Sequence, residues 1–223
     1  MTDASLPILL GTAVTLGFTH TLIGADHYVP FVALARARRW SARRALLVTL
    51  ACGLGHVASS VLIGALGIAL GAALGSLEAL ESVRGGWASW GLIAFGLGYG
   101  AWGLRRALRG RGHGHRHLPG GRHVEEGETR SVTFWTLFIV FVLGPCEPLI
   151  PLLMFPAARH DWHGVALVTF TFGTATVATM CALVWAGTRG LALIRAPALE
   201  RYAHALAGGI IAMSGAAIRV FGI

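Results

Sequence analysis

Six long apolar stretches follow one another along the chain, and short segments that carry its arginines separate them. Each stretch is close to or longer than the roughly 20 residues that an α-helix needs to cross a lipid bilayer. The stretches occupy residues 6–35, 45–74, 87–104, 133–157, 165–186 and 205–223. This pattern predicts an all-α integral membrane protein with six transmembrane helices. The first helix is expected to be retained, because no basic segment precedes it as in a cleaved signal.

The composition agrees with this class and excludes an ordinary soluble domain. Of the 223 residues, 55% are hydrophobic and 13% are charged, and the mean hydropathy is +0.66. A soluble domain carries about 25% charged residues. No phosphate-binding glycine-rich loop adjoins a soluble segment, so ATP-driven pumping is not expected. We expect neither enzymatic activity nor a tightly bound cofactor.

The arginines predict the orientation of the chain. The first, third and fifth connections hold 5, 7 and 3 of the 18 arginines, while Arg84, Arg159 and Arg219 lie elsewhere. Basic residues concentrate on the cytoplasmic side of membrane proteins. We therefore expect a multi-pass protein of the cell (inner) membrane with both termini outside the cytoplasm. The lipid bilayer is an expected partner and nucleic acid is not, because no soluble basic module is present.

The two halves of the chain resemble each other weakly. Residues 26–31 align with residues 147–152, and residues 53–59 align with residues 173–179. Each half holds three predicted helices, and an odd number makes the second half enter the membrane from the opposite face. We therefore predict two inverted three-helix repeats, at 1–106 and 131–223, joined by a cytoplasmic loop at 107–130. The sequence leaves both a monomer and a homo-oligomer open.

Ionisable residues inside the apolar stretches are the candidate site, because such groups are costly in lipid and commonly mark a pathway. They are His20, Asp26 and His27 in the first stretch, His56 in the second, and Cys146 and Glu147 in the fourth. Imidazole, thiolate and carboxylate together suit Ni²⁺, Co²⁺ or Zn²⁺ better than Mg²⁺ or Ca²⁺. The expected metal ligands are His20, Asp26, His27 and His56. The expected function is transport of a divalent transition-metal ion, the expected partner, through a midplane site.

Two of these segments resemble nickel/cobalt transporters. Asp26 and His27, preceded by His20, look like the His-x4-Asp-His signature of that superfamily, with a spacing one residue longer. Residues 54–61 resemble its Leu-Gly-His-Ser-Thr-Val-Val motif, which includes a histidine at the position of His56. The resemblance extends to six-helix nickel/cobalt efflux and urease-accessory membrane proteins. It implies that these histidines and Asp26 handle nickel or cobalt.

A third segment favours a different class. Residues 144–148, Gly-Pro-Cys-Glu-Pro, are similar to the Pro-Cys kink of cytochrome c biogenesis thiol-disulfide carriers, which are also pairs of inverted three-helix repeats. That chemistry needs two cysteines, one per half, and Ala25 stands where the partner of Cys146 is expected. Cys52 or Cys181 could substitute for it. A thiol-disulfide carrier, and an exporter of a small sulfur-containing anion, therefore remain as alternatives.

The predicted cytoplasmic loop is rich in glycine, arginine and histidine. Its histidines are His113, His115, His117 and His123. Such a segment has too little apolar surface to fold by itself. It is either a collector of metal ions or a solvated linker, and the sequence leaves both open.

Overall fold

The computed structural model describes residues 5–71, 73–109, 125–192 and 200–221 and is all-helical in those ranges. The predicted loop histidines lie outside the described residues. The helices are α1 (Ser5–Ile23), η1 (Ala25–His27), α2 (Val29–Ala37), α3 (Ala42–Ala69), α4 (Leu74–Leu108), α5 (Glu125–Leu143), α6 (Leu149–Ala158), α7 (Trp162–Ala192) and α9 (Ala203–Phe221).

Four of the described helices are long and apolar enough to cross a membrane, namely α1, α3, α7 and α9. Many large apolar side chains face outward, among them Leu70, Phe170 and Met213, which are 83%, 73% and 73% exposed. Such exposure is costly in water and favourable in lipid. The chain is therefore an integral membrane protein of the all-α class, as its sequence predicts.

Two of the six predicted spans are not continuous helices. The first consists of α1, the single turn η1 and α2, with Pro30 in the first turn of α2. The fourth consists of α5 and α6, which are separated at residues 144–148. Proline has no N–H to donate and clashes with a preceding helical turn, so Pro145 and Pro148 prevent a helix from running through this segment.

The third predicted span, residues 87–104, lies inside the 35-residue helix α4. This helix is not among the four described helices that are long and apolar enough to cross a membrane, and its N-terminal part carries Glu78, Glu81 and Arg84. Arg84 is thus part of a helix and not of a connection.

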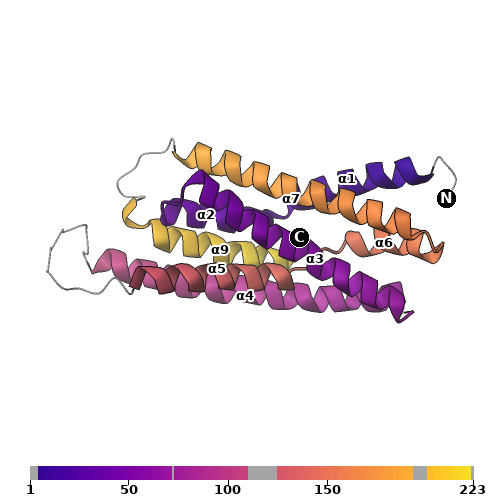
Figure 1. The fold of residues 1–223 in the computed structure, drawn as a ribbon. Coiled ribbons are helices and arrows are strands. Elements are labelled where there is room, and N and C mark those ends of the chain that lie inside the picture. The colour runs from indigo at the N-terminus through magenta and orange to yellow at the C-terminus, as the bar shows by residue number, and fades with distance from the viewer. Residues whose placement is uncertain (1–4, 72, 110–124, 193–199, 222–223) are drawn as a thin grey trace.

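The helices lie side by side in an elongated bundle (Figure 1). Helix α1 packs against α7, α5 packs against α3, α3 also packs against α7, and the most extensive pairing joins α4 to α9. At the α4–α9 contact the two backbones touch. A Cβ atom added to Gly208 would overlap Gly100 and lie 2.5 Å from the Gly96 carbonyl oxygen.

The buried side chains form two apolar clusters. One includes Phe31, Leu34, Leu137 and Ile211 and joins the C-terminal part of the first broken span to α3, α4, α5, α7 and α9. The other includes Val57, Cys146, Leu149 and Phe172 and lies between α1, α3, α6 and α7. His27 and Glu147, which lie in the two interruptions, both line a polar cavity at the centre of the bundle.

Candidate functional site

Three histidines from three different helices meet in the bundle, and we call them the histidine triad. His20 lies in the last turn of α1, His27 in η1 and His56 in α3. The ring centroids of His20 and His27 are 4.6 Å apart, those of His27 and His56 5.0 Å, and those of His20 and His56 6.4 Å. His27 and His56 are each 3% exposed. The structure therefore brings together three of the six site residues predicted from the sequence.

The interruption after α1 is what brings His27 onto the other two rings. On a continuous helix, Asp26 and His27 would point in directions about 100° apart. Gly24 ends the helix instead, and the following turn folds His27 back so that its Nδ1 lies 3.1 Å from the Gly24 carbonyl oxygen. The same Nδ1 lies 3.1 Å from Asp26 Oδ1. Asp26 therefore contacts the triad through His27.

Gly24 has no room for a side chain. A Cβ atom at this position would lie 2.6 Å from His27 Nδ1. Gly24→Ala is therefore expected to displace the His27 ring and to reduce stability by about 1–3 kcal/mol, as overpacking does. Thermal unfolding in detergent measures the loss. Gly11→Ala, on the preceding helix α1, is the matched control, because a Cβ there has no neighbour within 4 Å. Equal melting temperatures for the two variants would contradict the prediction.

A cavity of about 220 Å³ opens from the triad between α4, α5 and α9. Its polar lining comprises the triad, Asp26, Ser82, Ser89, Glu147 and Arg219. Asp26 has 23% of its side chain exposed. Glu147 is exposed and lines the cavity, but it is not part of the triad. The two carboxylates predicted for the site therefore face one cavity at different depths.

Cys146 is placed differently from the prediction. Its side chain is fully buried in the apolar cluster with Val57, Leu149 and Phe172, and it is not among the residues that line the cavity. Its neighbours Pro145 and Glu147 do line it. In this conformation Cys146 is therefore not a member of the polar site. The sequence could not show this, because the direction of a side chain in an irregular segment depends on tertiary packing.

A buried ion pair holds the backbone of the segment around Cys146. Glu81 is 0% exposed, and it pairs with Arg84 one turn later on α4. Glu81 Oε2 accepts hydrogen bonds from the Cys146 backbone N–H at 3.0 Å and from the Ser60 hydroxyl at 3.1 Å. Arg84 donates to the Val142 carbonyl oxygen at 2.6 Å, to the Ser59 hydroxyl at 2.8 Å and to the Gly144 carbonyl oxygen at 3.3 Å. We call this set of contacts the Glu81–Arg84 network.

Sequence reasoning missed the Glu81–Arg84 network. Arg84 was noted only as an arginine outside the three arginine-rich connections, and Glu81 was not singled out. The sequence did contain one signal for this network. Glu81 and Arg84 are three residues apart, which places them on one face of a helix. The signal applies only if the helix includes both residues, as α4 does from Leu74 onward. The network supplies partners for backbone groups that the interruption between α5 and α6 leaves without helical hydrogen bonds.

The other two cysteines lie away from the polar centre. Cys52 is fully buried on α3 in the first apolar cluster, and Cys181 is half-buried on α7 beside the second. The helices that carry them pack together, since a Cβ at Gly53 would lie 3.1 Å from Met180 Sδ. All three cysteines are unpaired as thiols.

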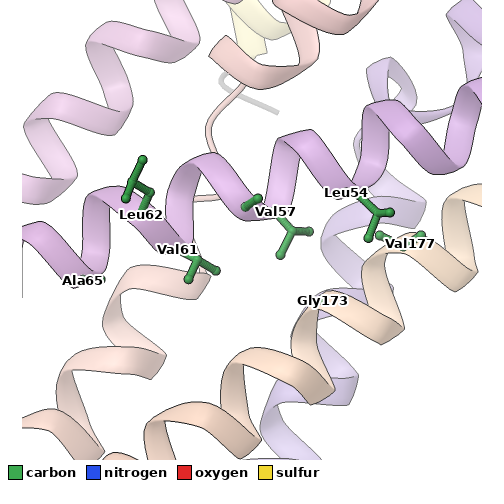
Figure 2. Close-up of a pocket in the computed structure, with 8 residues that line it drawn as sticks. Leu54, Val57, Val61, Leu62, Ala65, Gly173 and Val177 are labelled. Atoms are coloured by element: carbon green, nitrogen blue, oxygen red, sulfur yellow. The ribbon is translucent and has the colours of Figure 1, made fainter.

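A second hollow lies on the outside of α3 and α7 (Figure 2). Its lining is apolar and includes Leu54, Val61, Leu62 and Val177. It holds no ionisable or nucleophilic side chain. We assign no chemistry to it.

Membrane-length apolar helices, two interrupted helices and a buried polar centre define an integral membrane protein with a polar site inside its helical bundle. A family model identifies the protein more closely. The chain belongs to the cytochrome C biogenesis protein transmembrane region family, whose model matches residues 12–217. Neither a curated protein nor a solved structure matches the chain.

This family membership corrects two sequence-based interpretations. The assignment to the nickel/cobalt transporter superfamily was wrong, and with it the function of a nickel- or cobalt-like metal carrier. The motifs that suggested it cover about a quarter of the chain, whereas the family model covers nearly all of it. The similarity of residues 144–148 to the Pro-Cys kink indicated the better class.

Proposed function

We propose that this protein is a thiol-disulfide carrier of the cytochrome c biogenesis type, which passes reducing equivalents across the inner membrane by way of Cys146. The match of the family model over residues 12–217 carries the proposal. Cys146 supports it further, because this residue lies in the interruption between α5 and α6, within the span where the chain resembles the Pro-Cys kink of such carriers.

The packing pattern supports two inverted repeats within this carrier. In each half an interrupted span comes first and a long helix follows, α3 in the first half and α7 in the second. Each interrupted span packs against the long helix of the other half, α1 on α7 and α5 on α3, while α4 packs on α9. A pseudo-twofold relation between the halves produces this exchange of partners. Carriers built in this way alternate access around a central site.

The expected requirement for two cysteines applies to a carrier that forms an internal disulfide. A single thiol can complete the exchange when donor and acceptor each supply two sulfur atoms. The Cys146 thiolate attacks a disulfide of an acceptor, which forms a mixed disulfide and releases one acceptor thiol. A donor thiolate then attacks Cys146 Sγ in the mixed disulfide and releases the second acceptor thiol. The second donor thiol attacks the new Cys146–donor disulfide, which closes the donor disulfide and returns Cys146 as a thiol. Two electrons and two protons pass from a pair of donor thiols, on one molecule or on two, to a disulfide acceptor. No second cysteine of this chain takes part in the exchange.

The Glu81–Arg84 network would position Cys146 between exchanges. The backbone N–H of Cys146 is bound by Glu81, and Arg84 holds the carbonyl groups of Val142 and Gly144. In this conformation the Cys146 thiol is buried in the apolar cluster with Leu149 and Phe172. The proposal therefore requires residues 144–148 to move as a unit and to present the Cys146 Sγ atom to a partner on either side.

Transfer across sealed vesicles tests the proposal. The purified chain is reconstituted with glutathione inside and a charged, membrane-impermeant aromatic disulfide outside, and the release of aryl thiolate is followed by absorbance. We expect Cys146→Ser to slow the release by about tenfold or more, to the rate of protein-free vesicles, since serine cannot form the mixed disulfide. The double variant Cys52→Ser/Cys181→Ser is the matched control and should keep its rate. Equal rates for native and Cys146→Ser vesicles would overturn the role of Cys146.

A further inference from the structure

The histidine triad presents three buried nitrogen atoms that have no partner. The Nε2 atoms of His20, His27 and His56 are all buried and make no hydrogen bond. One nitrogen from each ring lies within 4.8 Å of the others. Buried polar atoms are nearly always paired, so three partnerless atoms within one cluster of rings indicate that something else binds there. The proposed thiol exchange at Cys146 does not use them.

The hydrogen bonds of two of the rings determine which nitrogen carries the proton. His27 Nδ1 lies 3.1 Å from both the Gly24 carbonyl oxygen and Asp26 Oδ1, and His56 Nδ1 lies 3.3 Å from the Phe141 carbonyl oxygen. These oxygens only accept hydrogen bonds, so both Nδ1 atoms carry hydrogen. In a neutral ring the Nε2 atom then has a lone pair and no hydrogen. The Nε2 atoms of His27 and His56 cannot bond to each other.

We propose that the histidine triad binds a single borderline transition-metal ion such as Zn²⁺, Co²⁺ or Ni²⁺. Neutral imidazole is a preferred ligand of these ions. Nitrogen ligands at about 2.0–2.1 Å from zinc in a tetrahedral arrangement are about 3.4 Å apart, so small rotations of the three side chains bring the nitrogen atoms into place. The ion is held inside the protein, and no transport of it is implied.

The surroundings of the triad support a cation over the other occupants. A water molecule can donate only two hydrogen bonds. When His20, like His27 and His56, carries its hydrogen on Nδ1, the three Nε2 atoms need three donors. Asp26 Oδ1 lies 3.1 Å from His27 Nδ1. Carboxylates commonly orient metal-binding histidines through a contact of this kind. Among the formal charges that line the cavity, Asp26 and Glu147 are negative and Arg219 is positive. The lining is therefore negative overall and favours a cation.

Metal content of the purified full chain tests the inference. Every protein, including the reference chain, carries serine at the four loop histidines, because that segment can bind metal independently. Each is loaded with Zn²⁺ or Co²⁺, desalted and measured for metal by mass spectrometry, and the cobalt form is also measured by visible absorption. We expect a single ion per chain in the reference. His27→Ala and His56→Ala should lose it, and Asp26→Asn should bind it about 10- to 100-fold more weakly.

Two control variants keep this result separate from folding and from thiol chemistry. His163→Ala removes an exposed histidine of α7, and Cys146→Ser removes the proposed exchanging thiol; both should keep the ion. Circular dichroism checks the fold of each variant. If either buried-histidine variant fails to fold, His20→Ala, at a half-buried position, takes its place and should also lose the ion. A reference chain without bound metal, or folded triad variants that retain it, would overturn the inference.

Discussion

Replacing Arg84 with methionine is expected to destabilise the protein by about 3–5 kcal/mol, the usual cost of leaving a buried charge without its partner. Glu81 would remain with 0% exposure and without its counter-ion. The carbonyl oxygens of Val142 and Gly144 would also lose their hydrogen-bond donor. Unfolding in detergent by heat or by added denaturant measures the change. The interruption between α5 and α6 should become accessible to protease before the rest of the bundle.

The exposed ion pair between Arg39 and Glu200 is the matched control. Its side chains are 70% and 54% exposed, and such pairs contribute about 0–1 kcal/mol. Arg39→Met should therefore change the free energy of unfolding little. A loss in Arg84→Met no larger than in Arg39→Met would show that the buried pair does not hold the centre together.

A double variant separates lost charge from lost packing. Glu81→Leu combined with Arg84→Met removes both charges and keeps apolar volume, and such replacements of buried ion pairs are commonly neutral or stabilising. We expect the double variant to recover part of the loss caused by Arg84→Met alone. Recovery should be incomplete, because the Cys146 backbone N–H loses its acceptor on Glu81. A double variant as unstable as the single one would mean that hydrogen bonding to the interruption dominates.

Gly208→Ala is expected to separate α4 from α9 and to cost about 3 kcal/mol or more, at the upper end of overpacking effects. The added methyl would meet backbone atoms, namely Gly100 and the carbonyl oxygen of Gly96 at 2.5 Å. Backbone cannot rotate away as a side chain can. Because α4 and α9 form the most extensive pairing in the bundle, a shift there also widens the cavity beside the histidine triad. The melting temperature in detergent is the measurement.

Gly209→Ala is the neighbouring control for this prediction. A Cβ atom at Gly209 has no neighbour within 4 Å, and alanine has the higher helix propensity. Its melting temperature should equal or slightly exceed that of the native chain. If Gly208→Ala and Gly209→Ala had the same melting temperature, the close approach of the two backbones would not be a source of stability.

The sequence determined that the protein is an all-α integral membrane protein, the approximate positions of its apolar segments and four of the residues of its polar centre. Long apolar stretches have few structures available to them in lipid, because every backbone polar group must be paired inside the segment. Histidine and aspartate in such stretches are costly enough to stand out without any structure. For these reasons His20, Asp26, His27 and His56 could be found from the sequence.

The tertiary structure decided which of those residues meet and how they are oriented. The turn after Gly24 placed His27 against His20 and His56, and the packing of α6 turned Cys146 into an apolar cluster and away from the cavity. It also brought Glu81 and Arg84 of α4 to the interruption between α5 and α6, about 60 residues away along the chain. Such contacts depend on helix ends and on the close approach of distant helices. Periodicity and composition describe each segment alone, so they do not contain this information.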